Sequence, residues 1–246
     1  MNAIIILIIV IIILYIIYKF SRRSAVEGDT EIYQIDKFNR KIYKKYLAYH
    51  KPIVITNYLT DFPSFETICF DVLKDIDINI KVQPKNKLAF KKKKKFINLR
   101  DYINNISNTN DVIYNNYAYF KHFTFERIIP NYKSITLTMN PKYCLNIFPN
   151  NFNTPITKNL NNKLLFLIYD GKVLINLLNP NNMNNQKLND MKFITQDNSR
   201  ILFDNENKLE LEPIQIICRP GKIIVIPQNW WYYIETEQPS ILVKLY

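Results

Sequence analysis

Apolar residues are distributed along this chain in three different ways. Residues 3–18 form one continuous apolar run without a charged side chain. The following part mixes apolar and polar residues and predicts helices over residues 37–49, 65–73 and 96–103 and strands over residues 52–56 and 76–82. From residue 134 onward, short apolar or alternating runs typical of strands lie at residues 134–139, 163–168, 173–178, 213–218, 223–226 and 240–246. Early helices and late strands predict an α+β domain with a barrel or sandwich core.

Two glycines lie between pairs of these predicted strands. Gly171 follows Asp170 between residues 163–168 and 173–178, and Gly221 follows Pro220 between residues 213–218 and 223–226. Glycine readily adopts the positive φ that tight turns need. Each pair of strands is therefore predicted to be joined directly, the first as a β-hairpin.

The N-terminal apolar run has the features of a membrane anchor. As a helix, its sixteen residues would be about 24 Å long, close to the thickness of a hydrocarbon core. Lys19, Arg22 and Arg23 follow the run and no positive charge precedes it, whereas a cleaved signal peptide normally carries its charge before the run. We therefore expect a single-pass transmembrane anchor over residues 1–20, a linker over residues 21–36, and a cytosolic domain over residues 37–246.

A surplus of basic residues adds possible partners. The formal net charge is +12, and a run of five consecutive lysines is formed by Lys91, Lys92, Lys93, Lys94 and Lys95. This run is either a solvated loop or, close to a membrane, a contact for anionic lipid. Nucleic acid is less favoured, because only Phe90 and Phe96 flank the run.

The number and spacing of the cysteines bear on zinc binding and on disulfides. The chain has three cysteines, and no two of them form a CxxC pair. Neither a zinc site nor a disulfide framework is therefore indicated.

Three segments occur in the order found in a known family. They are Lys51–Leu59 with Phe62–Phe65, Thr154–Asn159 with Leu164–Ile168 and Gly171-Lys172, and Arg219–Pro227 with Trp230-Trp231-Tyr232. Together they resemble the cupin-like branch of the JmjC-type 2-oxoglutarate oxygenases over most of residues 51–246. The resemblance implies a double-stranded β-helix (cupin or jelly-roll) core with flanking helices.

The same resemblance implies a metal site whose ligands have changed. The family binds Fe(II) through a His-x-Asp pair on one strand and a second histidine after the tryptophan pair. This chain has Thr157, Asn159 and Tyr232 at those positions. Neutral oxygens are poor substitutes for imidazole and carboxylate, so we assign no metal ligand and no catalytic residue. A displaced iron site would need both remaining histidines, His50 and His122.

One basic residue matches a further feature of the family. Relatives often carry a basic residue that grips the 2-oxoglutarate carboxylate, and Lys172, fifteen residues after Thr157, matches its place. Lys172 is either an anion-binding residue or an exposed turn lysine. The first interpretation implies binding of 2-oxoglutarate or a similar small acid without iron.

The sequence thus favours a membrane-anchored, non-catalytic pseudo-oxygenase with a binding or structural role and an unidentified protein partner. Two alternatives stay open. One is an active Fe(II)- and 2-oxoglutarate-dependent hydroxylase or demethylase with a displaced site. The other is a membrane interaction protein that contacts lipid or nucleic acid.

Overall fold

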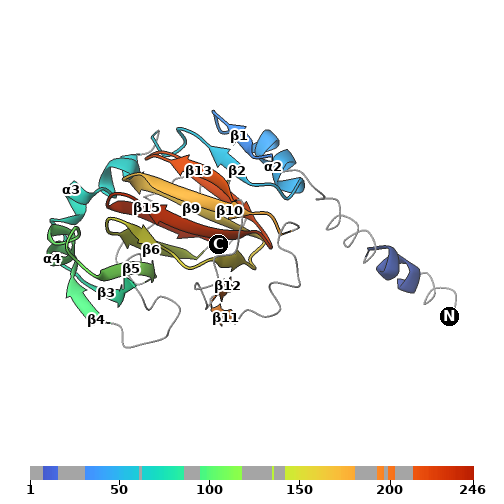
Figure 1. Ribbon diagram of the computed structural model, residues 1–246. Helices are drawn as coiled ribbons and strands as arrows, with labels where there is room; N and C mark the ends of the chain where they lie inside the picture. Colours follow the sequence, from blue (N-terminus) through green and yellow to red (C-terminus); the bar gives the residue numbers. More distant parts are fainter. Residues whose placement is uncertain are drawn as a thin grey trace.

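The structure is a computed structural model, and it describes residues 8–15, 31–60, 63–85, 95–117, 135, 142–180, 193–196, 199–202 and 213–246. These residues form a mixed α+β, strand-rich structure with two large sheets, compatible with a β-sandwich or jelly roll (Figure 1). The α+β class predicted from the sequence is therefore confirmed.

The N-terminal half contains short strands and helices. Its elements are β1 (Tyr33–Ile35), α2 (Arg40–Ala48), β2 (Ile53–Ile55), the 3-10 helix η1 (Pro63–Thr67), α3 (Phe70–Leu73), β3 (Asn79–Pro84), β4 (Lys95–Asn98), α4 (Leu99–Asn104) and β5 (Asp111–Asn116). The helix predicted near residues 37–49 and the strands predicted near residues 52–56 and 76–82 are present. Strand β1 lies within the predicted linker and pairs in parallel with β2.

Two helix predictions in this half need correction. The helix predicted over residues 65–73 is divided into η1 and α3. The helix predicted over residues 96–103 is wrong in its first part, because β4 extends to Asn98 and α4 begins at Leu99. The Asn98 side chain accepts a hydrogen bond from the Arg100 N–H at 2.9 Å, and this N-cap fixes where the helix starts.

The C-terminal half is built from strands. They are β6 (Tyr143–Phe148), β7 (Phe152–Asn153), β8 (Thr157–Asn159), β9 (Lys163–Asp170), β10 (Val173–Leu178), β11 (Phe193–Gln196), β12 (Ser199–Leu202), β13 (Ile214–Cys218), β14 (Ile223–Pro227), β15 (Trp231–Thr236) and β16 (Ser240–Leu245). Of the strand predicted over residues 134–139, all but Ile135 lies outside the described residues.

From β8 to β10, and again from β13 to β16, consecutive strands alternate between the two sheets. Among the described residues, one sheet has nine strands in the order β1-β2-β14-β9-β16-β6-β5-β3-β4. The second sheet has the order β11-β12-β8-β15-β10-β13, with β7 paired to β15. The hairpin predicted at Gly171 is therefore wrong, because β9 and β10 belong to different sheets. The chain likewise crosses between sheets at Gly221, from β13 to β14.

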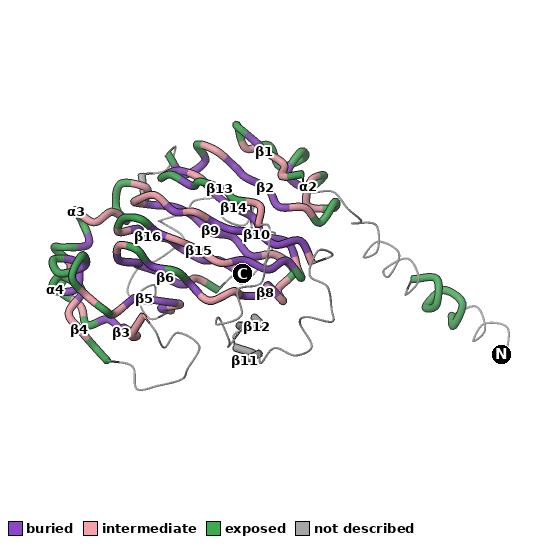
Figure 2. Tube along the Cα trace, viewed as in Figure 1, coloured by how far each residue is buried: buried purple, intermediate pink, exposed green. Residues whose placement is uncertain are grey.

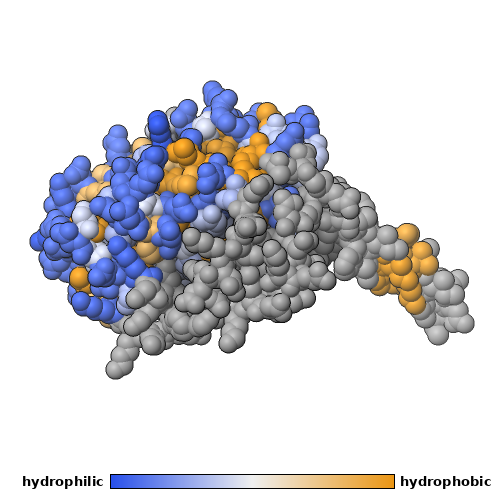
Figure 3. Space-filling view, viewed as in Figure 1, coloured by the Kyte–Doolittle hydropathy of each residue, from blue (hydrophilic) through white to orange (hydrophobic). Residues whose placement is uncertain are grey.

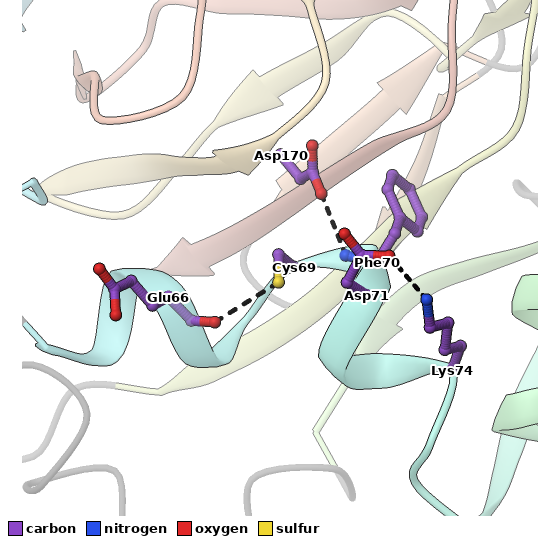
Figure 4. A network of polar contacts seen from close by, with 6 residues as sticks. All are labelled: Glu66, Cys69, Phe70, Asp71, Lys74 and Asp170. Carbon is purple, nitrogen blue, oxygen red and sulfur yellow. Dashed lines mark hydrogen bonds and ion pairs between the residues drawn. The ribbon is translucent and has the colours of Figure 1, made fainter.

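A carboxylate at the end of β9 holds this crossing in place. Asp170 accepts hydrogen bonds from the backbone N–H of Gly171 at 2.8 Å and of Phe70 at 3.0 Å. Figure 4 shows the bond from Phe70. Phe70 is the first residue of α3, and the N-cap residue Cys69 makes no side-chain cap bond of its own. Asp170 thus caps a helix that lies 100 residues earlier in the chain and ties the crossing to it.

We expect Asp170→Ala to lower the free energy of unfolding by about 1–2 kcal/mol, since a cap and a turn hydrogen bond are lost together. Asp71→Ala is the matched control. Asp71 is exposed and, in the described structure, pairs with the neighbouring Lys74 at 2.8 Å, so its removal is expected to change stability little. Urea titration of both variants measures the difference. Equal effects would contradict a capping role for Asp170.

The apolar side chains form two layers. One cluster lies between the sheets and includes Phe166, Ile224, Leu242, Ile175 and Tyr232. The other covers the outer face of the nine-stranded sheet, against which α2, α3 and α4 pack residues such as Tyr43, Leu73 and Tyr102. Figure 2 shows the buried residues along the central strands and the exposed surfaces of the helices around them. A strand with both faces buried has a nearly continuous apolar sequence, as β9 does.

At the N-terminus, residues 8–15 are helical, and all eight are exposed (Figure 3). The remainder of the predicted anchor over residues 1–20 lies outside the described residues. Within the described part of the chain, no helix is both long and apolar enough to cross a bilayer.

Candidate functional site

The structure brings together the three residues that stand at the family's ligand positions. Thr157 and Asn159 lie on β8, and Tyr232 lies on the neighbouring strand β15, directly opposite Thr157. Residues two apart on a strand share a face, as do residues opposite each other on paired strands. All three are at most 2% exposed. We call Thr157, Asn159 and Tyr232 the ligand-position residues.

Hydrogen bonds already occupy the side chain of Asn159. Its amide nitrogen donates to the carbonyls of Ile226 at 3.0 Å and Pro227 at 2.9 Å, and its amide oxygen accepts from the Asn161 N–H at 3.0 Å. Ile226 and Pro227 belong to β14 in the other sheet. Asn159 therefore links β8 of one sheet to the end of β14 in the other sheet.

The other two ligand-position residues offer only neutral hydroxyls. The Thr157 hydroxyl donates to the Pro155 carbonyl at 3.0 Å. The Tyr232 ring packs edge-on against Phe166, and its buried hydroxyl has no hydrogen-bond partner among the described residues. Burial raises the pKa of this phenol, so it stays protonated at neutral pH. A hydroxyl, an occupied amide and a neutral phenol do not fit an Fe(II) centre.

The remaining histidines and the tryptophan pair have separate positions. The His50 carbonyl accepts a hydrogen bond from the Trp230 indole at 3.1 Å, and His122 lies outside the described residues. Trp230 packs into the core between the sheets, whereas Trp231 contacts the Lys158 ammonium, 5.6 Å from its ring centre. Among the described residues, no group of three or more His, Cys, Asp or Glu side chains is placed to hold a metal ion.

Sequence reasoning missed a buried lysine near this site. Lys244 is 2% exposed and lies two residues after Leu242, on the face of β16 that meets the other sheet. Its ammonium donates to the Asn115 side chain at 3.4 Å and lies 5.2 Å from the Tyr246 ring. No carboxylate among the described residues forms an ion pair with it. A lysine within the otherwise apolar run of residues 241–245 was the available signal.

The tyrosine Tyr114 connects this lysine with the ligand-position residues. Its phenol is buried, and burial is the main cause of its raised pKa. The neighbouring Tyr232 raises that pKa further, and the charge of Lys244 opposes the rise. Tyr114 therefore lies close enough to interact electrostatically with both Tyr232 and Lys244. Among the described residues, the interior at this end contains the Lys244 ammonium and the neutral hydroxyls of Thr157, Tyr114 and Tyr232.

Lys172 does not belong to this group. It lies next to the start of β10, where its ammonium pairs with the Glu237 carboxylate at 3.1 Å. Tyr232 lies five residues from Glu237 along the chain, which corresponds to about 17 Å in a strand. Lys172 therefore contributes to a different place, on the outer face of the seven-stranded sheet.

The lysine run falls mostly outside the described residues. Nothing in the structure places Lys91, Lys92, Lys93 and Lys94, so their predicted role as a solvated loop or a lipid contact stays a prediction. Lys95 is described, and it is the exposed first residue of β4. The prediction of a loop is therefore wrong at Lys95, because this residue pairs with Val82 of β3.

Fold and site together define a class: a strand-rich α+β protein with two large sheets and a buried polar group of neutral oxygens between them. No protein-family model matches the chain, and no curated protein matches it.

Proposed function

We propose that this chain is a cupin-like scaffold that binds a ligand or partner and does not catalyse an oxygenase reaction. The order of its core strands supports a double-stranded β-helix. Strands β14, β9, β16 and β6 lie side by side in one sheet, and β8, β15, β10 and β13 lie side by side in the other. A jelly roll places eight strands alternately in two sheets in this manner.

The observation that carries the proposal is the position of the ligand-position residues. They lie together on the paired strands β8 and β15, as the resemblance to the JmjC-type oxygenases requires. Their donor atoms are a hydroxyl, an amide and a phenol. The amide of Asn159 holds β8 to β14, so a structural role has replaced a metal-binding one.

The buried Lys244 supports binding of a small acid. A buried ammonium is costly when no carboxylate pairs with it, as holds for Lys244 within the described structure, and an anionic ligand would supply the missing charge. The Tyr232 hydroxyl, unpartnered among the same residues, could donate a hydrogen bond to this anion. Lys244 therefore replaces Lys172 as the anion-binding residue that we propose. Its ligand is a small carboxylic acid such as 2-oxoglutarate, held without iron.

The full-length chain, purified in detergent, tests this function. We expect far less than one iron per chain by elemental analysis and no succinate formation from 2-oxoglutarate. We also expect 2-oxoglutarate to raise the thermal unfolding temperature, and Lys244→Met to abolish that rise while Lys172→Met preserves it. Stoichiometric Fe(II) with turnover, lost on replacing His50 or His122, would establish the enzyme alternative instead.

The apolar residues 3–18 and the charges after them support a membrane tether with the domain in the cytosol. The lysine run close to this tether supports an additional contact with anionic lipid, to which Phe96, 66% exposed beside Lys95, would add an apolar side chain. Deleting residues 3–18 is expected to move the protein from the membrane fraction to the soluble fraction. An unchanged distribution would argue against the tether.

A further inference from the structure

A hollow lies on the outer face of the seven-stranded sheet, away from the ligand-position residues. Its volume is about 550 Å³, within the range of small-ligand sites. It is lined by Asn151, Asn153, Lys172, Leu174, Gln215, Ile217, Glu235, Thr236 and Glu237. We call it the outer hollow.

The floor of the outer hollow is a single row of side chains across four strands. Asn153 lies opposite Glu235, Glu235 opposite Leu174, and Leu174 opposite Ile217. One half of the row is therefore a carboxylate and an amide, and the other half is aliphatic. Since neighbouring strands are about 4.8 Å apart, the step from Glu235 to Ile217 is about 10 Å.

The charges in the outer hollow favour a cation. Its lining contains two carboxylates and one ammonium. Lys172 is engaged by Glu237 at 3.1 Å, whereas the Glu235 carboxylate has no hydrogen-bond or ion-pair partner in the described structure. A further cation, Lys222, donates to the Ile217 carbonyl at 3.2 Å, at the aliphatic end of the row. A ligand cation is therefore attracted to the Glu235 end.

The next row of the same sheet has a polar group without partners in the described part of the chain. Asn176 lies opposite both Gln215, which lines the outer hollow, and Tyr233. It is fully buried, and neither its amide nitrogen nor its amide oxygen has a hydrogen-bond partner there. A buried amide left unpaired costs about 1–3 kcal/mol, and no described residue offsets that cost for Asn176.

From these observations we infer that the outer hollow binds an aliphatic ammonium group. The ammonium lies against Glu235, and its alkyl chain crosses Leu174 toward Ile217. A chain of four or five methylene groups, about 6 Å long, fits between Glu235 and Ile217 and leaves the charge at the polar end of the row. The ligand is either a free alkyl amine or the side chain of a lysine in a peptide, since both present one ammonium group at the end of an alkyl chain.

Calorimetric titration of the full-length chain tests the inference with two probes. They are the five-carbon amine n-pentylamine and lysine blocked at its α-amino and carboxyl groups. Blocked lysine acetylated at its side chain is the uncharged control. We expect both amines to bind and the acetylated compound not to bind. Whichever amine binds more tightly identifies the source of the ligand.

Variants make the test specific to the outer hollow. Glu235→Gln is expected to weaken amine binding by about tenfold or more, because a charge-assisted contact is lost. Lys172→Met is expected to strengthen it, because the Glu237 carboxylate is released. Asp71→Asn, an exposed acid elsewhere, serves as the control and leaves affinity unchanged. Absence of binding at about 10 mM amine, or equal affinity in Glu235→Gln, would overturn the inference.

Discussion

Replacing Gly171 with alanine is expected to lower the free energy of unfolding by about 3 kcal/mol or more. Gly171 has a φ of +81°, which costs an alanine about 1–2 kcal/mol. An added Cβ would also lie 2.8 Å from the Cα of Ser240 and still closer to the Pro239 carbonyl oxygen. Both are backbone atoms, so the crossing from β9 to β10 or the start of β16 has to shift. Guanidinium denaturation measures the loss.

Gly221→Ala is the matched control for this prediction. Gly221 also has a positive φ, +91°, but the nearest atom to an added Cβ is the Thr60 methyl at 3.0 Å. A side-chain methyl can move away more easily than backbone. The control is therefore expected to lose only about 1–2 kcal/mol, mainly from its backbone conformation. If both variants lose the same amount, close packing at Gly171 does not contribute.

Replacing Asn159 with aspartate is expected to destabilise the protein by about 3 kcal/mol or more, although the two side chains have nearly the same shape. The amide nitrogen donates to two carbonyls of β14. A carboxylate cannot donate there and instead places a buried negative charge against two carbonyl oxygens. Burial and these oxygens raise the pKa of the introduced carboxyl group in the folded state above its unfolded value. The loss of stability is therefore expected to shrink as the pH falls and the carboxyl group becomes protonated.

Asn162→Asp is the control for Asn159→Asp, because Asn162 is exposed three residues further along the chain. Its substitution is expected to change stability little at any pH. Chemical denaturation of both variants at neutral and acidic pH provides the comparison. A pH-independent effect of Asn159→Asp, no larger than that of the control, would show that the amide does not hold the sheets together.

The sequence predicted strand positions better than strand partners. Asp170-Gly171 correctly marks a reversal between β9 and β10, but a local turn signal does not say whether the chain returns within one sheet or crosses to another. In the structure the crossing is held by the cap that Asp170 provides to Phe70 and by the close approach of Gly171 to Ser240. Both partners are remote in sequence, so no local pattern reveals them.

The candidate site was predictable in part for a similar reason. The two-residue repeat of a strand places Thr157 and Asn159 on one face, and the family resemblance adds Tyr232. The cross-sheet bonds of Asn159 were not predictable, because they depend on how β14 passes over β8. Lys172 was proposed because the family resemblance places a basic residue at about that distance after Thr157. The burial of Lys244 is found only once β16 is seen to have both faces buried.

The place of β16 has a consequence for synthesis of the protein. This strand lies in the nine-stranded sheet between β9 and β6, pairing with both, although both precede it by many residues in the chain. Until β16 has emerged from the ribosome, β9 and β6 each present an open, apolar edge, the kind of surface that promotes association between nascent chains. A variant that lacks residues 240–246 should thus keep this edge open permanently, and chaperone dependence during translation should end only when β16 has joined the sheet.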